Sequence, residues 1–217
     1  MSRILELDKR MIKVIEKNII RASLQEDNKN NYREYFKEVI PLVDNVKGSL
    51  VECGFGKGKT ANIFTDFMLD GIIQKRNMHF YDSFIGFPTP TKEDKSKRNP
   101  QKGQWAIPIE EANKVKEKAN VPVEVVKGYF EDTTKDYNGG PIAVLHIDCD
   151  LYQSYKTVLE TLYDKVVPGG LIMFDEYGEG TKWPGAVQAI NEFFENKNVE
   201  FFRYQFPEFG KFCMIKP

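Results

Sequence analysis

The chain has few of the residues on which disulfide frameworks, zinc sites and multi-histidine sites depend. It contains three cysteines, Cys53, Cys149 and Cys213, and no Cys-x-x-Cys pair. An odd number without that spacing argues against a disulfide scaffold or a zinc site and predicts a reducing, cytoplasmic setting. Histidine occurs only as His79 and His146, so a site that needs several histidines is excluded.

Long apolar runs and a large excess of charge of one sign are also absent. No hydrophobic stretch approaches the ~18 residues of a membrane span, and the first ten residues are already charged, unlike a secretory signal. The net charge is −1 over 217 residues. We therefore expect neither a membrane nor nucleic acid as a partner. The length fits one α/β domain with an ample core, and the sequence leaves a homo-oligomer open.

Strand-like and helix-like segments alternate along the chain, which predicts a Rossmann-like α/β fold, a parallel sheet with helices on both faces. Apolar residues at helical spacing predict helices at 4–25 and 32–43. Residues 1–47 are therefore expected to form a helical cap ahead of a cofactor-binding domain at 48–217. Seven strands are predicted, at 49–53, 78–83, 122–127, 142–148, 170–175, 199–204 and 211–215. The last two are separated by a short loop and suit an antiparallel pair.

A long segment, at about 85–119, separates the second and third predicted strands. Its first part is punctuated by proline and carries five lysine and arginine residues between Lys92 and Lys102. Loops of this length in a compact domain are usually lids or binding elements. We therefore expect a mobile lid that closes over the bound substrate, here called the acceptor. The basic residues fit either a solvated loop face or contacts with a phosphorylated acceptor.

A glycine-rich turn, Val51-Glu52-Cys53-Gly54-Phe55-Gly56-Lys57-Gly58, follows the first predicted strand. Glycine lets the backbone approach a ligand closely, and the next helix offers free N–H groups. A phosphate-binding loop would need glycine in place of Cys53, and a dinucleotide fingerprint would need its third glycine one residue later. Two interpretations remain: a turn that binds S-adenosylmethionine (SAM), with Glu52 facing the methionine end, or a tight structural turn.

Asp82 ends the second predicted strand and strengthens the cofactor interpretation. A carboxylate there can accept hydrogen bonds from both ribose hydroxyls, although a strand-end cap is the alternative. The residues after the third strand could line an adenine pocket or simply pack. The predicted cofactor-binding residues are Glu52, Gly54, Gly56, Gly58, Asp82, Ser83, Gly128, Tyr129 and Phe130.

Acidic motifs end the fourth and fifth predicted strands, His146-Ile147-Asp148-Cys149-Asp150 and Phe174-Asp175-Glu176-Tyr177. The carboxyl ends of parallel strands meet at one edge of the sheet, where ligands bind. Converging carboxylates repel one another unless a cation lies between them, and oxygen ligands favour a hard ion such as Mg²⁺. We predict a metal site at Asp148, Asp175 and Glu176. The structural alternative is helix capping, for example by Asp150.

Taken in order, these motifs resemble the macrocin-type sugar O-methyltransferases, a SAM-dependent, metal-using family. The matching segments are 51–58, 81–88 (Tyr-Asp-Ser-Phe-Ile-Gly-Phe-Pro), 128–133 (Gly-Tyr-Phe-Glu-Asp-Thr), 146–152, 168–170 (Pro-Gly-Gly), 174–177 and 183–186 (Trp-Pro-Gly-Ala). The resemblance implies the class I methyltransferase fold, SAM contacts at the glycine turn and Asp82, and metal ligands at Asp148 and the pair Asp175-Glu176. The family usually has Asp-Asp at that pair. Glu176 is therefore expected either to bind the metal directly or to support the residues that bind it.

The resemblance also implies the reaction: transfer of a methyl group from SAM to a sugar hydroxyl, assisted by Mg²⁺. The acceptor would be a glycoside, a polysaccharide or a nucleotide-linked sugar. Asp148 is expected to act as ligand and proton acceptor, with His146 as a second candidate base or merely a buried histidine. Catechol-type relatives have lysine where this chain has Leu151, which disfavours a catechol. A non-sugar acceptor, a catalytically silent SAM-binding protein and a nicotinamide-dependent oxidoreductase remain as alternatives, although the last leaves the acidic motifs unexplained.

Overall fold

The computed structural model describes residues 28–178, 182–205 and 210–217, and the helix expected at 4–25 lies outside them. Its strands are β1 (Ser49–Cys53), β2 (Met78–Asp82), β3 (Val123–Lys127), β4 (Ile142–Ile147), β5 (Val166–Phe174), β6 (Phe202–Gln205) and β7 (Gly210–Ile215). The α-helices are α2 (Asn28–Val39), α3 (Lys59–Leu69), α4 (Glu110–Lys118), α5 (Phe130–Thr133), α6 (Tyr152–Leu162) and α7 (Pro184–Phe194). Short 3₁₀ turns are η1 (Ile40–Val43), η2 (Lys92–Asp94), η3 (Thr134–Asp136) and η4 (Tyr163–Lys165).

The seven strands form one sheet in the order β3-β2-β1-β4-β5-β7-β6. Strands β1 to β5 are parallel, and β7 runs antiparallel between β5 and β6. The predicted antiparallel pair at the end of the chain is therefore confirmed. The strand order reverses between β1 and β4, and a crevice at the carboxyl ends of such neighbours is where open α/β sheets bind ligands.

Two strands begin three or four residues away from the sequence-based expectation, and the other strand boundaries differ from it by at most one residue. Strand β5 begins at Val166, four residues before the predicted start, because an irregularity in its pairing with β4 accommodates Pro168 and the two glycines that follow. Strand β6 begins at Phe202, later than predicted.

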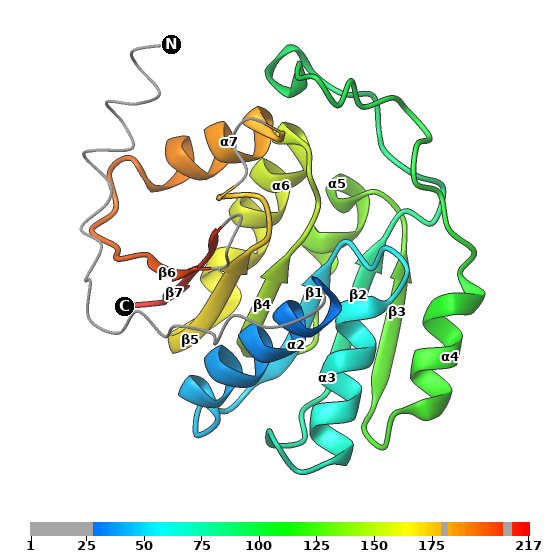
Figure 1. Cartoon of the computed structure of the whole chain (residues 1–217), viewed down its shortest axis with the longest axis vertical. Coiled ribbons are helices and arrows are strands. Elements are labelled where there is room, and N and C mark those ends of the chain that lie inside the picture. Colours follow the sequence, from blue (N-terminus) through cyan, green and yellow to red (C-terminus); the bar gives the residue numbers. More distant parts are fainter. Residues whose placement is uncertain (1–27, 179–181, 206–209) are drawn as a thin grey trace.

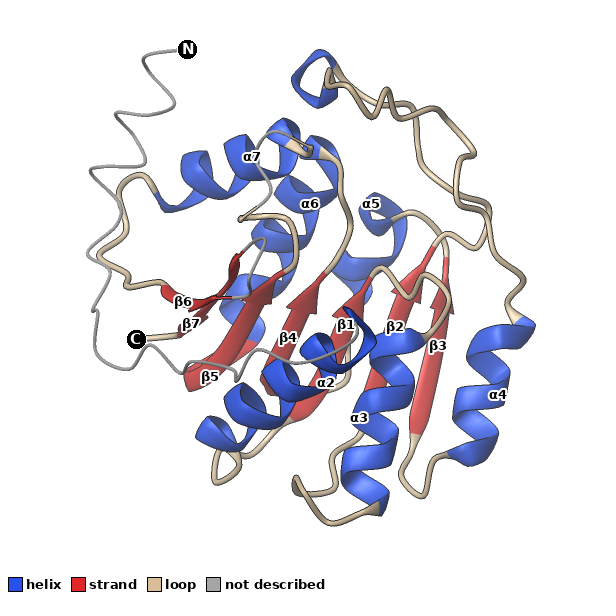
Figure 2. Ribbon diagram, viewed as in Figure 1, coloured by secondary structure: helices blue, strands red, loops and turns tan. Residues whose placement is uncertain are grey.

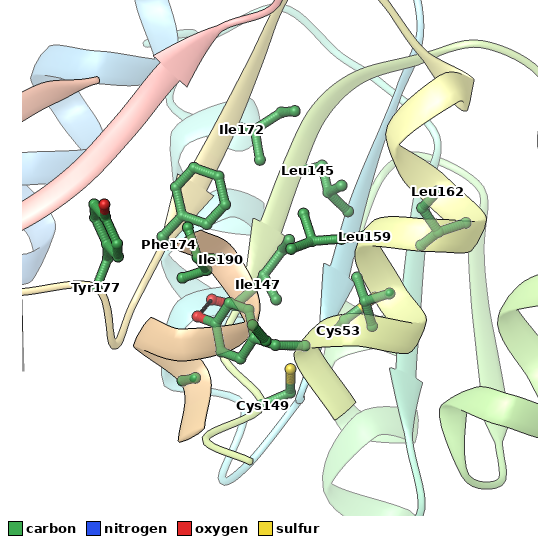
Figure 3. Packing of buried hydrophobic residues seen from close by; sticks show 14 of the residues in the cluster. Cys53, Leu145, Ile147, Cys149, Leu159, Leu162, Ile172, Phe174, Tyr177 and Ile190 are labelled. Carbon is green, nitrogen blue, oxygen red and sulfur yellow. Dashed lines mark hydrogen bonds between the residues drawn. The ribbon is translucent and has the colours of Figure 1, made fainter. Parts of the chain in front are cut away.

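Helices cover both faces of the sheet, with α2, α3 and α4 on one side and α5, α6 and α7 on the other (Figure 2). Alternate strand residues therefore enter different cores. Val144 packs with the α2 and α3 side chains, whereas Leu145 and Ile147 pack with α6 and α7. Figure 3 shows the second core, in which these side chains meet Leu159 and Ile190. Burial on both faces explains the near-continuous apolar sequence of the strands.

The lid comprises residues 83–109, and α4 forms the remainder of the long predicted segment. It rises above the carboxyl ends of the strands and extends toward α6 and α7 (Figure 1). Its two arms pair through hydrogen bonds from Phe87 N to Gln104 O and from Gly103 N to Phe87 O, both 2.9 Å. The buried Asp94 carboxylate accepts a 2.7 Å hydrogen bond from Tyr152 N at the start of α6. The lid is thus held at its middle, and its closure over an acceptor stays a prediction.

None of the helices described here has the length and apolar character that a membrane span requires.

Candidate active site

A cavity of about 690 Å³ lies at the carboxyl ends of the parallel strands. The glycine turn, the ends of β2 to β5, the lid, α2 and the residue before α7 all contribute to its wall. Most of the predicted site residues line it, namely Gly54, Gly56, Asp82, Ser83, Gly128, Tyr129, Phe130, Asp148, Asp175 and Glu176. Glu52, Gly58 and His146 are not among the described residues of the wall.

The glycine turn meets the end of β4 at Gly54. This residue has φ +96°, and a Cβ atom there would lie 1.7 Å from the Asp148 carbonyl oxygen, so any larger residue would push the two segments apart. Gly56 also has positive φ, +51°, but a Cβ atom there would meet nothing within 4 Å. Its backbone is therefore open on the cavity side, where a ligand can approach it closely.

Asp82 fixes the glycine turn as well as lining the cavity. Its Oδ2 accepts hydrogen bonds from Phe55 N at 2.9 Å and Gly56 N at 3.3 Å, and its Oδ1 accepts one from Phe84 N at 2.7 Å. Burial raises the pKa of Asp82, although these donors oppose the shift. A carboxylate has about four acceptor positions, so any ribose hydroxyl would share the Asp82 carboxylate with these backbone donors.

Glu52 points away from the position expected for it. Its Oε1 lies 3.1 Å from His146 Nδ1, and both side chains are fully buried. The two residues are direct neighbours on the paired strands β1 and β4, on the face covered by Phe36 and Phe64. A role for Glu52 against the methionine end of a cofactor is therefore not supported by its position. Gly58 lies beneath the Phe55 ring, where it starts α3 with φ +70°.

His146 is likewise held behind the cavity rather than on its wall. Burial alone lowers the pKa of the imidazole, but the hydrogen bond and charge of Glu52 outweigh burial and raise it. One ring nitrogen lies within 4.8 Å of carboxylate oxygens of Asp148 and Asp175. A histidine bonded to a carboxylate on one nitrogen and facing ligands with the other is a common arrangement beside metal ions.

Four carboxyl groups converge at the acidic edge of the cavity. Ligand atoms of Asp148, Asp150 and Glu176 lie within 4.8 Å of one another, and Asp148 also approaches Asp175 in the same way. Burial and the charge of Asp175 raise the pKa of Asp148 to about 7. Burial, followed by the neighbouring carboxylates, raises the pKa values of Asp150 and Glu176 well above their ordinary range. A divalent cation would relieve this repulsion, and the all-oxygen donor set fits a hard ion.

Lys211 supplies a positive charge that the sequence motifs do not reveal. Its Nζ lies 2.7 Å from Asp175 Oδ2 and donates to the Asp175 carbonyl oxygen at 2.6 Å. The side chain is fully buried beside the Tyr32 ring. Burial alone lowers the pKa of Lys211, but the charge of Asp175 reverses the shift, so the amine stays protonated. One oxygen of Asp175 is thus already bonded to Lys211.

Glu176 is fixed by a tyrosine behind it. The Tyr155 hydroxyl contacts Glu176 Oε2 and donates a 2.8 Å hydrogen bond to the Ile147 carbonyl oxygen. Glu176 also lines the cavity, and one of its carboxylate oxygens lies within 4.8 Å of carboxylate oxygens of Asp148 and Asp150. The structure therefore accommodates the longer glutamate side chain at the position where the resembling family usually has aspartate.

Several wall residues were not predicted as site residues. Asp150 lies in a tight turn with φ +60°, a conformation that aspartate tolerates better than most residues. Others include Tyr32 of α2, Phe87, Arg98 and Trp105 of the lid, and Trp183 before α7. Phe87 and Trp183 belong to motifs noted in the sequence, and Arg98 is one of the basic lid residues noted there. Tyr32 and Trp105 had no such signal and reach the cavity through tertiary packing.

Taken together, the sheet order, the antiparallel final strands and the glycine turn at the β1–β4 crevice define a class I SAM-dependent methyltransferase fold. The calicheamicin methyltransferase CalS11 shares this fold, with a TM-score of 0.76 and 21% identity over 97% of this chain and 91% of that chain. The chain belongs to the macrocin O-methyltransferase (TylF) family, whose model matches residues 24–202.

Two curated relatives extend the comparison. A Streptomyces olivaceus enzyme named 8-demethyl-8-(2,3-dimethoxy-α-L-rhamnosyl)-tetracenomycin-C 4′-O-methyltransferase is 30% identical over 152 residues, which make up 66% of this chain and 58% of the relative. The mycinamicin III 3″-O-methyltransferase of Micromonospora griseorubida is 26% identical over 169 residues, 73% of this chain and 65% of the relative. The chain thus spans less than two thirds of the length of either relative.

Proposed function

We propose that this protein is a SAM-dependent O-methyltransferase that acts on a sugar hydroxyl, with a divalent cation such as Mg²⁺ assisting. The observation that carries the proposal is one cavity that joins the glycine turn and Asp82 to the carboxylates Asp148, Asp150 and Asp175. Membership of the TylF family supports the reaction class. The rhamnosyl group in the name of the S. olivaceus relative supports a sugar acceptor.

The glycine-turn side of the cavity would hold SAM. The open backbone at Gly56 admits close approach, and Asp82 would accept the ribose hydroxyls while it keeps the turn in place. Gly128, Tyr129 and Phe130 after β3 would border the adenine. When bound, SAM supplies an electrophilic methyl group, and a divalent cation lowers the pKa of a hydroxyl that it coordinates.

The acidic side would hold the metal and accept the proton of the acceptor. Asp148, Asp175 and Glu176 are the proposed ligands, and Asp150 shares a cluster with two of them. Asp148 is the proposed proton acceptor because it lines the cavity within the acidic cluster while its backbone packs against Gly54 of the glycine turn. During transfer the hydroxyl proton would pass to a carboxylate oxygen of Asp148, while the lid and Trp183 exclude water. The position of His146 behind the wall disfavours it as the base.

The proposal is tested by incubating the purified protein with SAM and matched glycosides, sugar phosphates and nucleotide-linked sugars, and by detecting methylated product by mass spectrometry. We expect product that depends on Mg²⁺ and is lost with EDTA or in Asp148→Asn. Methylation of non-sugar hydroxyls alone would redirect the acceptor assignment. SAM binding in calorimetry without any transfer would overturn the enzymatic proposal.

A further inference from the structure

Three aromatic rings gather where the lid meets the start of α7. The ring centroids of Phe87 and Trp105 are 5.0 Å apart, and those of Trp105 and Trp183 are 5.6 Å apart. All three side chains line the cavity. Trp183 is buried, whereas Trp105 is about half exposed, at 51%. A large indole face left uncovered beside a polar cavity is a feature that ligand sites use for stacking.

Arg98 is the lid cation that belongs to this group. Its guanidinium carbon lies 4.9 Å from the centroid of the Trp183 ring, within the range of a cation–π contact. The other lid cations, Lys92, Lys95, Lys97 and Lys102, are not among the described residues that line the cavity, whereas Arg98 is. Among the described residues, no carboxylate lies within ion-pair distance of the Arg98 side chain.

The charge distribution of the cavity gives Arg98 a directional role. The carboxylates of Asp148, Asp150 and Asp175 repel any anionic part of a ligand. Lys211 is already bonded to Asp175, and the more distant charge of Arg98 acts on Asp150 from the lid side. An anionic acceptor therefore has its most favourable position with the anion at the lid and its hydroxyl groups toward the carboxylates. A guanidinium held over an indole ring keeps N–H donors that match phosphate or carboxylate oxygens.

We propose that Arg98, Trp105 and Trp183 form an acceptor subsite that stacks a sugar ring on indole and binds an anionic oxygen group attached to that sugar. The inference rests on the proposed function and specifies its substrate class: an acidic sugar, with either a phosphate, as in a nucleotide-linked sugar, or a carboxylate, as in a uronic acid. By holding the anion at the lid, Arg98 selects which hydroxyl faces Asp148.

The chain itself offers a binding reporter for this subsite. It contains two tryptophans, and both belong to the subsite, so intrinsic tryptophan fluorescence responds to its occupancy without any need for turnover. Glucose 1-phosphate, methyl glucuronide and methyl glucoside form a matched set with one ring and a phosphate, a carboxylate or no charge. Titrations of the whole protein with SAM present and metal omitted keep phosphate from chelating Mg²⁺.

We expect at least one anionic sugar to change the fluorescence saturably and to bind about tenfold or more tightly than methyl glucoside. The phosphate and carboxylate titrations then identify the source of the anion. Arg98→Gln should remove that advantage, Arg98→Lys should keep part of it, and Lys102→Gln, a lid cation outside the wall, should leave it unchanged. Melting temperatures verify that each variant is folded.

Equal binding of neutral and anionic sugars, or unchanged anion binding in folded Arg98→Gln, would overturn the subsite. The methyl-transfer assay separates this outcome from failure of the proposed function. Anion-dependent fluorescence without any methyl transfer would leave the subsite standing and overturn the enzymatic assignment. If the protein methylates a neutral glycoside and Arg98→Gln does not change the rate, the enzymatic assignment stands and the subsite is overturned.

Discussion

Replacing Lys211 by methionine tests whether this buried lysine balances the carboxylates of the site. Methionine keeps an unbranched apolar stem but removes the ammonium group that bonds Asp175 Oδ2 at 2.7 Å. Asp175 would then face Asp148 without the ammonium group bonded to it, and the buried His146 would be the nearest remaining basic group among the described residues. Loss of one partner of a buried ion pair typically costs about 3–5 kcal/mol. For a domain of this size that corresponds to a fall in melting temperature of about 6–20 °C.

The pH dependence of the Lys211→Met variant has a defined sign. An unpaired buried carboxyl has a folded-state pKa above its unfolded value of about 3.9, so the folded state binds the proton more tightly. The resulting stability is present at low pH and is lost as pH rises toward the raised folded pKa. We therefore expect the deficit of the variant relative to wild type to be larger at pH 8 than at pH 5. Mg²⁺ should raise the melting temperature of the variant more than that of wild type, because it replaces the missing charge.

The assay is thermal and urea unfolding at both pH values, in EDTA and in Mg²⁺. Adding Asp175→Asn to Lys211→Met should recover part of the loss, because the unpaired charge is removed, and this double-mutant comparison isolates the pair from general effects on packing. Lys216→Met, which removes a lysine bonded to the Tyr163 and Val166 carbonyl oxygens, is the control and should leave the Mg²⁺ response unchanged. A loss below about 1 kcal/mol at pH 8 in EDTA, or an equal loss at both pH values, would refute the reasoning.

Three further predictions address the cofactor, the metal and the lid. Asp82→Ala should weaken SAM binding in calorimetry by about 1.5–3 kcal/mol; it should also lower the melting temperature, because three backbone N–H groups lose their acceptor. Wild-type affinity in the folded variant would contradict the ribose assignment. Asp148→Asn should reduce methyl transfer by about 10²–10⁴-fold while SAM affinity stays near normal, and a full rate in demetallated wild-type enzyme would make the acidic edge structural. Asp94→Ala should speed tryptic cleavage of the lid, because it removes the acceptor for Tyr152 N, whereas SAM plus acceptor should slow cleavage of wild type. Equal cleavage of wild type with and without ligands would exclude closure.

The sequence alone determined the sheet and the edge at which the site lies. Strands buried on both faces need near-continuous apolar runs, and these are local patterns that can be read directly. The carboxyl ends of parallel strands must meet at one edge, so the positions of the glycine turn, Asp82 and the acidic motifs at strand ends were enough to group them. The same reasoning predicted the antiparallel final pair from the short loop between its strands.

The tertiary structure alone decided which side chains became partners. Glu52 and His146 are 94 residues apart and meet because β1 and β4 pair in a particular register. Phe174 pairs with Phe212, and this antiparallel register of β5 and β7 brings Lys211 beside Asp175. Such contacts depend on strand order and register, which local sequence patterns do not specify.

For the lid, too, the sequence predicted the general role and the tertiary structure decided which residues contact one another. Its length, prolines and basic residues predicted a binding element, but they did not distinguish Arg98 from the neighbouring lysines. The structure makes that distinction. Asp94 of the lid is bonded to the start of α6, and Arg98, four residues further along the lid, lies over the Trp183 ring. The role of one cation among five is a matter of which ring it packs on, and only the folded chain brings that ring within reach.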